Sequence, residues 1–427
     1  MKFSVNQILI FLLYGYVFLA PFEDILEFLY GIDTVLKPYR VFGILLLLIG
    51  FFYRFPKKPL VAVQIDWLIV AHMAYAALYT YFLYAIGKNV NLGIFLNTMI
   101  QMFFLMLIHL TVKRIDLTYK HFHWIMFFLT LGLIINAGVI VTDFYIFKLS
   151  TREKGLSDNS NYAALSMVLA ALYYLFLLVR EKMNLFRLRN FFFLAIVIYF
   201  FFGILATGSR TGFILLTFCS FLFLVVFSNL QVRIRLVPLA VIGLIIIFLT
   251  PVFSNITEDV ATFNRLTQAT EDVRVPLAKA GFNAIKDTWG MGIGIAQMID
   301  AQNFNKYIGP VDKAFLSVVD NRGKGLGLHN MYIEMVVEVG IIGSFIFFLF
   351  LVYIFVFQLR RLNYKPRRLE HILLLTMFIA GAITGLSGKG LLGAIFWLIY
   401  TLCSYPFKEE PALEEEGKPA LAAKPIS

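Results

Sequence analysis

Long apolar segments alternate with short polar ones along most of the chain. A membrane-spanning helix needs about 20 mostly apolar residues, and segments of this kind recur from near the first residues to about residue 405. They predict twelve spans, at residues 5–22, 41–53, 65–86, 92–112, 122–145, 161–179, 191–207, 212–228, 236–254, 330–357, 371–387 and 391–405. The second and the last are short, so we expect them to be tilted, extended by flanking residues or partly re-entrant.

The composition agrees with a membrane protein. Of 427 residues, 60% are hydrophobic and 15% are charged, whereas a soluble domain averages about 25% charged residues. We therefore expect an all-α, polytopic integral membrane protein. The first apolar segment lacks an Ala-x-Ala cleavage pattern and is interpreted as a retained span rather than a signal peptide. Cys219 and Cys403 lie inside apolar segments, so neither indicates a disulfide or a metal framework.

The loop charges predict the orientation of the spans. Cytoplasmic loops carry an excess of Lys and Arg, and here every second short loop is basic, at residues 54–58, 113–120, 180–189, 233–235 and 360–368. The first loop on the other side carries the acidic residues Glu23, Asp24, Glu27 and Asp33. We therefore expect both termini to be cytoplasmic. The net charge of +11 reflects this asymmetry and does not indicate a nucleic-acid partner.

One long polar segment divides the chain. Residues 1–254 form a membrane domain with nine spans, 255–328 a large loop on the outer face, 329–405 three further spans, and 406–427 a disordered cytoplasmic tail. Loops this long are usually functional or disordered. This one contains a helical pattern over residues 275–288, with one apolar stripe and with Pro276 suited to its first turn. We expect an amphipathic helix near the membrane surface there.

Three arginines outside the cytoplasmic loops are candidates for chemistry. Arg210 lies between two spans with almost no loop, where a permanent charge is costly and usually functional or paired. The alternative is an arginine that reaches the interface along its apolar stem. Arg274 precedes the predicted surface helix, and a helix N-terminus with an arginine attracts phosphate groups. The alternative is an exposed arginine balanced by nearby acids. Arg265 is the weaker third candidate.

His329 stands where the long polar segment becomes apolar, and it is the histidine that the loop charges assign to the outer face. The ordinary imidazole pKa of about 6.5 suits a general base. The alternative is an interfacial histidine that only caps a helix. Glu334 and Glu338 share one helix face. Glu338 is expected to serve structure rather than to orient His329.

The sequence indicates neither a metal site nor a cofactor. No clustered set of His, Asp and Glu of the metal-ligand type occurs, and there is no Asp-x-Asp pair. A metal-independent mechanism is therefore favoured. The absence of a Walker loop and of a dinucleotide fingerprint argues against ATP hydrolysis and nucleotide cofactors.

Four short patterns together resemble the O-antigen ligase family, which includes O-antigen polymerases. Residues 329–333 (His-Asn-Met-Tyr-Ile) with 338–343 (Glu-Val-Gly-Ile-Ile-Gly) resemble its His-Asn-x-Tyr-Leu and Glu-x-Gly-x-x-Gly signature. Residues 209–212 (Ser-Arg-Thr-Gly) resemble its Ser-Arg-x-Gly pattern. Arg274, followed by a helix and by Gly-Met-Gly-Ile-Gly at 290–294, is similar to its outer-loop segment. The segment from Gly155 to Ala164, with Asn161, is similar to its Asn-x-x-Ala pattern. A departure is Trp289, where the family often has proline.

The resemblance implies a membrane glycosyltransferase of the bacterial inner membrane with a periplasmic active site. The donor would be a glycan linked to undecaprenyl diphosphate, and in a ligase the acceptor would be a sugar hydroxyl of the lipid A core. His329, Arg210 and Arg274 would then be catalytic, with inversion at the anomeric carbon. Substrate-binding residues would be Arg265, Asn330, Tyr332, Asn161 and Ser209.

Several alternatives stay open from the sequence. A polymerase would use the same donor with a growing glycan as acceptor, and the shared patterns do not separate it from a ligase. A protein-glycosylating relative would be expected to carry more outer-face sequence after the histidine span. A lipid-linked oligosaccharide flippase or other transporter predicts polar residues deep in several spans, and those are scarce here. A purely structural membrane protein would leave Arg210 and His329 without a reason.

Overall fold

The computed structural model describes residues 4–30, 37–53, 60–147, 154–157, 159–181, 187–226, 230, 274–310, 312, 327–387 and 392–409. Within these ranges every regular element is a helix. The β contact found there is an isolated bridge between Thr118 and Lys408. The expected all-α class is therefore confirmed for this part of the chain.

Among the described residues, six helices are long and apolar enough to cross a bilayer. They are α4 (Leu60–Ala85), α5 (Leu92–Val112), α6 (Tyr119–Val141, continued by the π-helical turn η1, Thr142–Ile146), α7 (Ser160–Arg180), α8 (Leu188–Ala206) and α16 (Met331–Arg361). Repeated crossings of this kind belong to a multi-pass membrane protein.

Other predicted spans coincide with shorter helices. These are α1 (Val5–Leu19), α3 (Pro38–Phe51), α9 (Arg210–Phe221, continued by η2, Leu222–Val226), α17 (Arg368–Thr384) and α18 (Ala394–Ser404). The predicted span at 236–254 lies outside the described residues. The total of twelve crossings therefore stays a prediction.

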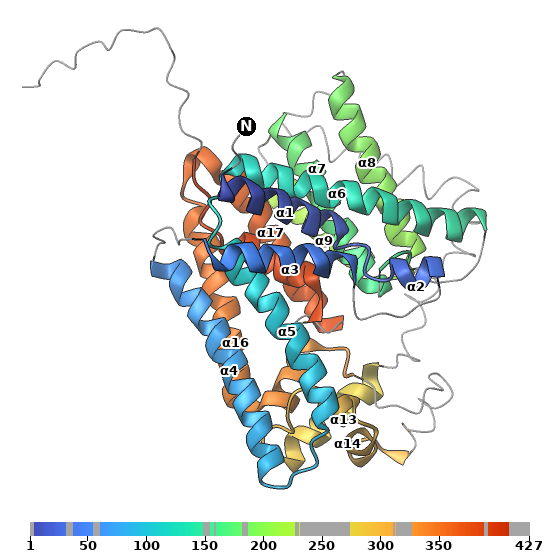
Figure 1. Ribbon diagram of the computed structural model, residues 1–427. Coiled ribbons are helices and arrows are strands. Elements are labelled where there is room, and N and C mark those ends of the chain that lie inside the picture. Colours follow the sequence, from blue (N-terminus) through green and yellow to red (C-terminus); the bar gives the residue numbers. More distant parts are fainter. Residues whose placement is uncertain are drawn as a thin grey trace, which may run out of the picture.

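The remaining helices are short and lie between the spans. They are α2 (Ile25–Tyr30), α13 (Arg274–Asp287), η4 (Gln297–Ile299), α14 (Ala301–Tyr307), η5 (Lys365–Arg367) and η6 (Gly385–Ser387). Figure 1 shows α13 and α14 beside each other, at the end of the bundle where α4 and α5 turn.

The helix α7 is the centre of the bundle. It is apolar around its whole circumference and packs against α6, α8, α9 and α17. In its most apolar stretch, 89% of α7 is buried inside the protein, compared with 28% for α8. On α8, Phe191 and Phe192 are exposed. A helix that is apolar all round is a core helix, whereas large exposed apolar surface on a bundle of this composition suits contact with lipid.

Both ends of the described chain lie at one end of the bundle, called here the terminal end. Asn6 exchanges hydrogen bonds with the backbone of Asp116, between α5 and α6. Lys408 forms the bridge to Thr118 and an ion pair with Asp116 at 2.6 Å. Tyr405 reaches the same loop, donating to the carbonyl of Ile115. The chain thus returns to the side from which α1 starts.

The opposite end, called here the loop end, carries the helices α13 and α14. Residues 274–308, named the α13–α14 unit, sit on the turn between α4 and α5. Asn89 and Asn303 exchange two hydrogen bonds of 3.1 Å, and Gln297 accepts from the backbone of Asn91 at 2.7 Å. Since buried amides without partners are costly, these bonds fix the unit against the membrane helices.

Candidate active site

The Ser-Arg-x-Gly pattern forms the turn that starts α9. Gly208 reverses the chain after α8 at φ 61°, a conformation that glycine adopts without a steric penalty. Ser209 is the N-cap, and its Oγ accepts a hydrogen bond from the backbone N–H of Gly212 at 3.1 Å. Arg210 is then the first helical residue and is half-buried. The turn places the guanidinium group at the N-terminus of a helix.

Asn161 and Ser209, both predicted to bind substrate, are brought together. Ser209 Oγ donates to Asn161 Oδ1 at 2.8 Å. A Cβ added to Gly212 would lie 2.5 Å from Ala164 Cβ, so α9 approaches α7 more closely than any other residue type would allow. Ser209 is buried, and its hydroxyl is engaged in both hydrogen bonds. Its contribution in this structure is to position Arg210 beside the start of α7.

His329 is held between two anchors. Leu328 is buried against α13. Asn330 is the N-cap of α16, and its Oδ1 accepts from the N–H groups of Tyr332 and Ile333, both at 3.1 Å. The Tyr332 hydroxyl donates to the carbonyl of Ala382 in α17 at 2.5 Å. His329 is half-buried between these fixed neighbours.

The backbone of His329 is in the left-handed region, at φ 52°. Among the described residues, Trp289 and Ala296 share this property, and both belong to the α13–α14 unit. Such conformations cost about 1 kcal/mol or more and cluster at functional sites. The left-handed backbone of His329 therefore supports a functional role for this residue.

Arg274 is the first residue of α13 and is half-buried. The predicted helix is confirmed to within one residue at each end. Its apolar stripe packs against protein: a Cβ on Gly281 would lie 2.8 Å from Ile333 Cγ2, in the first turn of α16. Leu277 and Ala284 are buried in the same cluster. Arg265 lies outside the described residues.

The two glycine-rich patterns meet through their backbones. The helix α16 is broken at Gly340, which has φ 70° and ψ −178°. The carbonyls of Val337 and Glu338 accept hydrogen bonds from Ile293 and Gly294, both at 2.8 Å, and Ile341 donates to Gly290 at 2.9 Å. The loop thus supplies the partners that a helix break would otherwise leave unsatisfied. The predicted span at 330–357 consists of a short segment before Gly340 and a longer one after it.

The described candidate residues form two groups, one at the starts of α7 and α9 and one at the starts of α13 and α16. The helix α17 links the elements of these groups, because it packs against α7, α9 and α16. Gly385, next to α17, approaches α16, since a Cβ there would lie 2.7 Å from Met331 Cε. Arg210 and Arg274 each begin a helix, and His329 precedes the N-cap of another. Helix N-termini attract anions.

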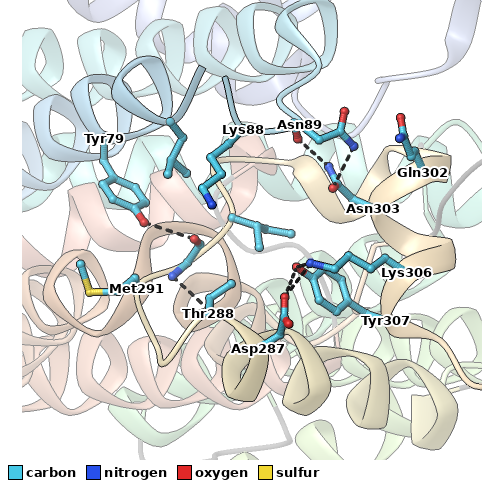
Figure 2. A pocket seen from close by; sticks show the side chains of 13 residues that line it. Tyr79, Lys88, Asn89, Asp287, Thr288, Met291, Gln302, Asn303, Lys306 and Tyr307 are labelled. Carbon is cyan, nitrogen blue, oxygen red and sulfur yellow. Dashed lines mark hydrogen bonds and ion pairs between the residues drawn. The ribbon is translucent and has the colours of Figure 1, made fainter. Parts of the chain in front are cut away.

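A cavity of about 550 Å³ lies at the loop end, and the sequence analysis missed its lining. Figure 2 shows the α4–α5 turn with Lys88 and Asn89 on one side, and Asp287, Asn303 and Lys306 from the α13–α14 unit on the other. The signal available was the polar turn Gly-Lys-Asn-Val-Asn at 87–91, between two predicted spans. Lys88 in this turn is a further cation at the loop end.

One ion pair shapes the wall of this cavity. Lys306 Nζ lies 2.6 Å from Asp287 Oδ2, and Tyr307 donates to the same oxygen at 3.2 Å. The hydrogen bond from Lys306 holds the pKa of Asp287 below its ordinary value, with a smaller contribution from Lys88. The same bond raises the pKa of Lys306. Asp287 therefore remains a carboxylate through the neutral range.

Comparison with known families bears on this geometry. Residues 195–348 match the family model described as O-Antigen ligase. The match covers about a third of the chain, so it shows a segment that is similar to this family. The matched segment includes the Ser-Arg-x-Gly turn, α13, the glycine loop and His329 with the break at Gly340, whereas Asn161 precedes it. A search of curated proteins gave no match. Among the described residues, no three His, Cys, Asp or Glu side chains gather as a metal site would require.

Proposed function

We propose that this protein is an O-antigen ligase. It would transfer a glycan from undecaprenyl diphosphate to a sugar hydroxyl of the lipid A core, at the periplasmic face of the bacterial inner membrane. Under this proposal the loop end faces the periplasm and the terminal end faces the cytoplasm. The basic loops at the terminal end, at 113–120 and 360–368, support that orientation.

One observation carries the proposal. Within the segment that matches the O-antigen ligase family, an arginine begins α9, a second begins α13, and His329 stands directly before the N-cap of α16. A lipid-linked donor reaches helix ends from the bilayer without leaving it. A diphosphate leaving group needs cations, and helix N-termini with arginines provide them.

The proposed reaction is a direct displacement. His329 takes the proton of the acceptor hydroxyl while the hydroxyl oxygen attacks the anomeric carbon of the donor. The bond between that carbon and the diphosphate oxygen breaks with its electron pair, and undecaprenyl diphosphate leaves. A single displacement inverts the anomeric carbon. In this scheme the chain's own side chains supply the base and the positive charge, and no metal takes part.

The arginines would act on the leaving group. Negative charge develops on the bridging diphosphate oxygen as the bond breaks. Arg210 and Arg274 offer paired N–H donors to phosphate oxygens, and stabilisation of developing charge is usually the largest single contribution to catalysis. Asn161 and Ser209 would serve by fixing the turn that carries Arg210. Asn330 and Tyr332 would fix the backbone next to His329. Arg265 stays a predicted substrate-binding residue.

The second candidate is an O-antigen polymerase, which the same domain allows. The reaction and its residues would be the same, and the acceptor hydroxyl would belong to a second lipid-linked glycan. A flippase is favoured less, because the sequence predicts the candidate residues on one face of the membrane rather than along a path through it.

The test is a product assay with purified full-length protein in lipid nanodiscs. The protein is given lipid A core and a lipid-linked repeat unit together, and products are separated by size and by core content. Glycan attached to the core is expected. Lengthened lipid-linked glycan without core attachment would assign the polymerase, and translocation without any covalent product would assign a transporter.

A further inference from the structure

The cavity between the α4–α5 turn and the α13–α14 unit has the chemistry of a ligand site. Most of the residues that line it have polar side chains, among them Tyr79, Asn89, Thr288, Gln302 and Asn303, while Leu83, Met291 and Ile293 add apolar surface. Ligand sites commonly combine apolar surface with a few placed polar groups. A sugar hydroxyl both donates and accepts hydrogen bonds, and amide side chains offer both functions.

The cavity is preformed rather than a gap between mobile parts. Its two walls are about 200 residues apart in sequence, and the two hydrogen bonds between Asn89 and Asn303 join them. Its floor is also tied, because the Tyr79 hydroxyl donates to the carbonyl of Gly292 at 3.2 Å. Gly292 belongs to the loop that is bonded to the break in α16. A rigid cavity binds a ligand without an ordering cost.

The cavity carries one unbalanced positive charge. Lys306 is paired with Asp287 across 2.6 Å. Lys88 is exposed, and within the described part of the chain no carboxylate lies at ion-pair distance from it. Figure 2 shows the Lys88 side chain extending into the space between Tyr79 and the end of α13. The lining therefore offers one ammonium group to a negatively charged substituent.

The position of the cavity indicates a long ligand. Arg274 and Asp287 are the two ends of α13, and a helix of this length places them about 20 Å apart at about 1.5 Å per residue. A molecule bound beside Asp287 would reach the Arg274 end only as part of a chain of several sugar units. The glycan substrates of the proposed function have that form.

We propose that this cavity is a distal subsite for an acidic oligosaccharide, in which Lys88 binds a carboxylate or phosphate group on a sugar unit. The inference rests on the proposed glycosyl transfer for the identity of its ligand, but the subsite is separate from His329. It would hold one unit of a glycan whose reacting end lies near Arg274 and His329. Glycans without a negative charge would bind less tightly.

Binding is tested with a hexamer of galacturonic acid and with maltohexaose, an uncharged hexamer, on full-length protein in nanodiscs. The background is His329→Ala, so that transfer does not disturb the measurement. The acidic hexamer is expected to bind at least about tenfold more tightly than the uncharged one, as for a charge-assisted hydrogen bond. Lys88→Ala should abolish this preference, and Lys88→Arg should retain it. The matched control is Lys286→Ala, an exposed lysine of α13 outside the cavity.

Equal binding of the two hexamers, or an unchanged preference in Lys88→Ala, would overturn the proposal. The source of the bound sugar is resolved by inhibition in the transfer assay with unmodified protein. The acidic hexamer should compete with the donor if the subsite holds donor glycan, and with the acceptor if it holds acceptor glycan. Transfer without hexamer preference would refute the subsite alone. Hexamer preference without any transfer would refute the proposed enzyme and leave the subsite.

Discussion

Gly292 and Gly340 lie backbone against backbone, where the glycine loop closes the break in α16. A Cβ on Gly292 would lie 2.6 Å from the backbone nitrogen of Gly340. A Cβ on Gly340 would overlap the carbonyl oxygen of Met291. These two glycines, one from each family pattern, let a loop and a helix share hydrogen bonds that a helix would otherwise make within itself.

Gly340→Ala is expected to separate this contact. The conformation at φ 70° and ψ −178° is open almost only to glycine, at a cost of about 1–3 kcal/mol for other residues. The steric overlap adds to that cost. We expect a lower temperature of unfolding, faster proteolysis of residues 274–308 and loss of transfer activity.

The matched control is Gly93→Ala, on the first turn of α5. A Cβ there meets only Asn91 Oδ1 at 3.4 Å, an ordinary contact. Equal stability and equal proteolysis of both alanine variants would contradict the role assigned to Gly340.

Ser209→Ala tests the turn that holds Arg210. It removes the N-cap of α9 and the hydrogen bond to Asn161, and loss of an N-cap costs about 1 kcal/mol. We expect that destabilisation together with a several-fold fall in transfer rate. Thr217→Ala removes a hydroxyl further along the same helix and should change neither quantity appreciably. A fall in activity for both variants alike would refute a specific role for Ser209.

Gln297→Ala tests the attachment of the α13–α14 unit. The buried side chain accepts from the N–H of Asn91 at 2.7 Å and donates to the carbonyl of Ile295 at 3.0 Å. Leaving buried groups unsatisfied costs about 1–3 kcal/mol, so the amides of residues 297–307 should exchange hydrogen faster. Gln302→Ala, at an exposed position, is the control. Unchanged exchange in Gln297→Ala would show that the unit is held by other contacts.

Acid should loosen the contact between the first outer loop and the segment before α7. Burial raises the pKa of Asp24, but hydrogen bonds from Lys154 and Lys37 outweigh it and bring the pKa below its ordinary value. A lowered pKa contributes stability above the unfolded value, about 3.9, and that contribution is lost as the pH falls further. The unfolding temperature should therefore drop in this acid range in the unmodified protein and drop less in Asp24→Asn. If the unfolding temperature depended on pH identically in the unmodified protein and in Asp24→Asn, the stabilising role of these ion pairs would be contradicted.

Local features of the structure followed from the sequence. The start of α9 was predictable because its N-cap and its two glycines lie within five residues, and the start of α16 was predictable from its N-cap Asn330. The helix α13 was found from one apolar stripe and one proline. Each of these depends on neighbours in the chain, which a pattern of residue types records directly.

Features that join distant segments were not predictable in this way. The hydropathy of residues 330–357 gives no sign of the break at Gly340, because the loop that bonds to the break, at residues 290–294, lies about 50 residues earlier in the chain. The cavity was missed for the same reason, since Lys88 and Lys306 come from opposite walls. A hydropathy pattern orders segments along the chain but does not show which backbones meet.

The most direct test of the central claim is the transfer rate of His329→Gly beside that of the unmodified protein. Glycine accepts the left-handed backbone of residue 329, so this variant removes the imidazole without adding strain. Ala296→Gly, at another left-handed position, controls for backbone freedom alone. We predict a fall of at least about 100-fold for His329→Gly, as for loss of a general base, with an unchanged unfolding temperature and normal activity in Ala296→Gly. A His329→Gly rate within a few-fold of the unmodified protein would contradict the proposed base.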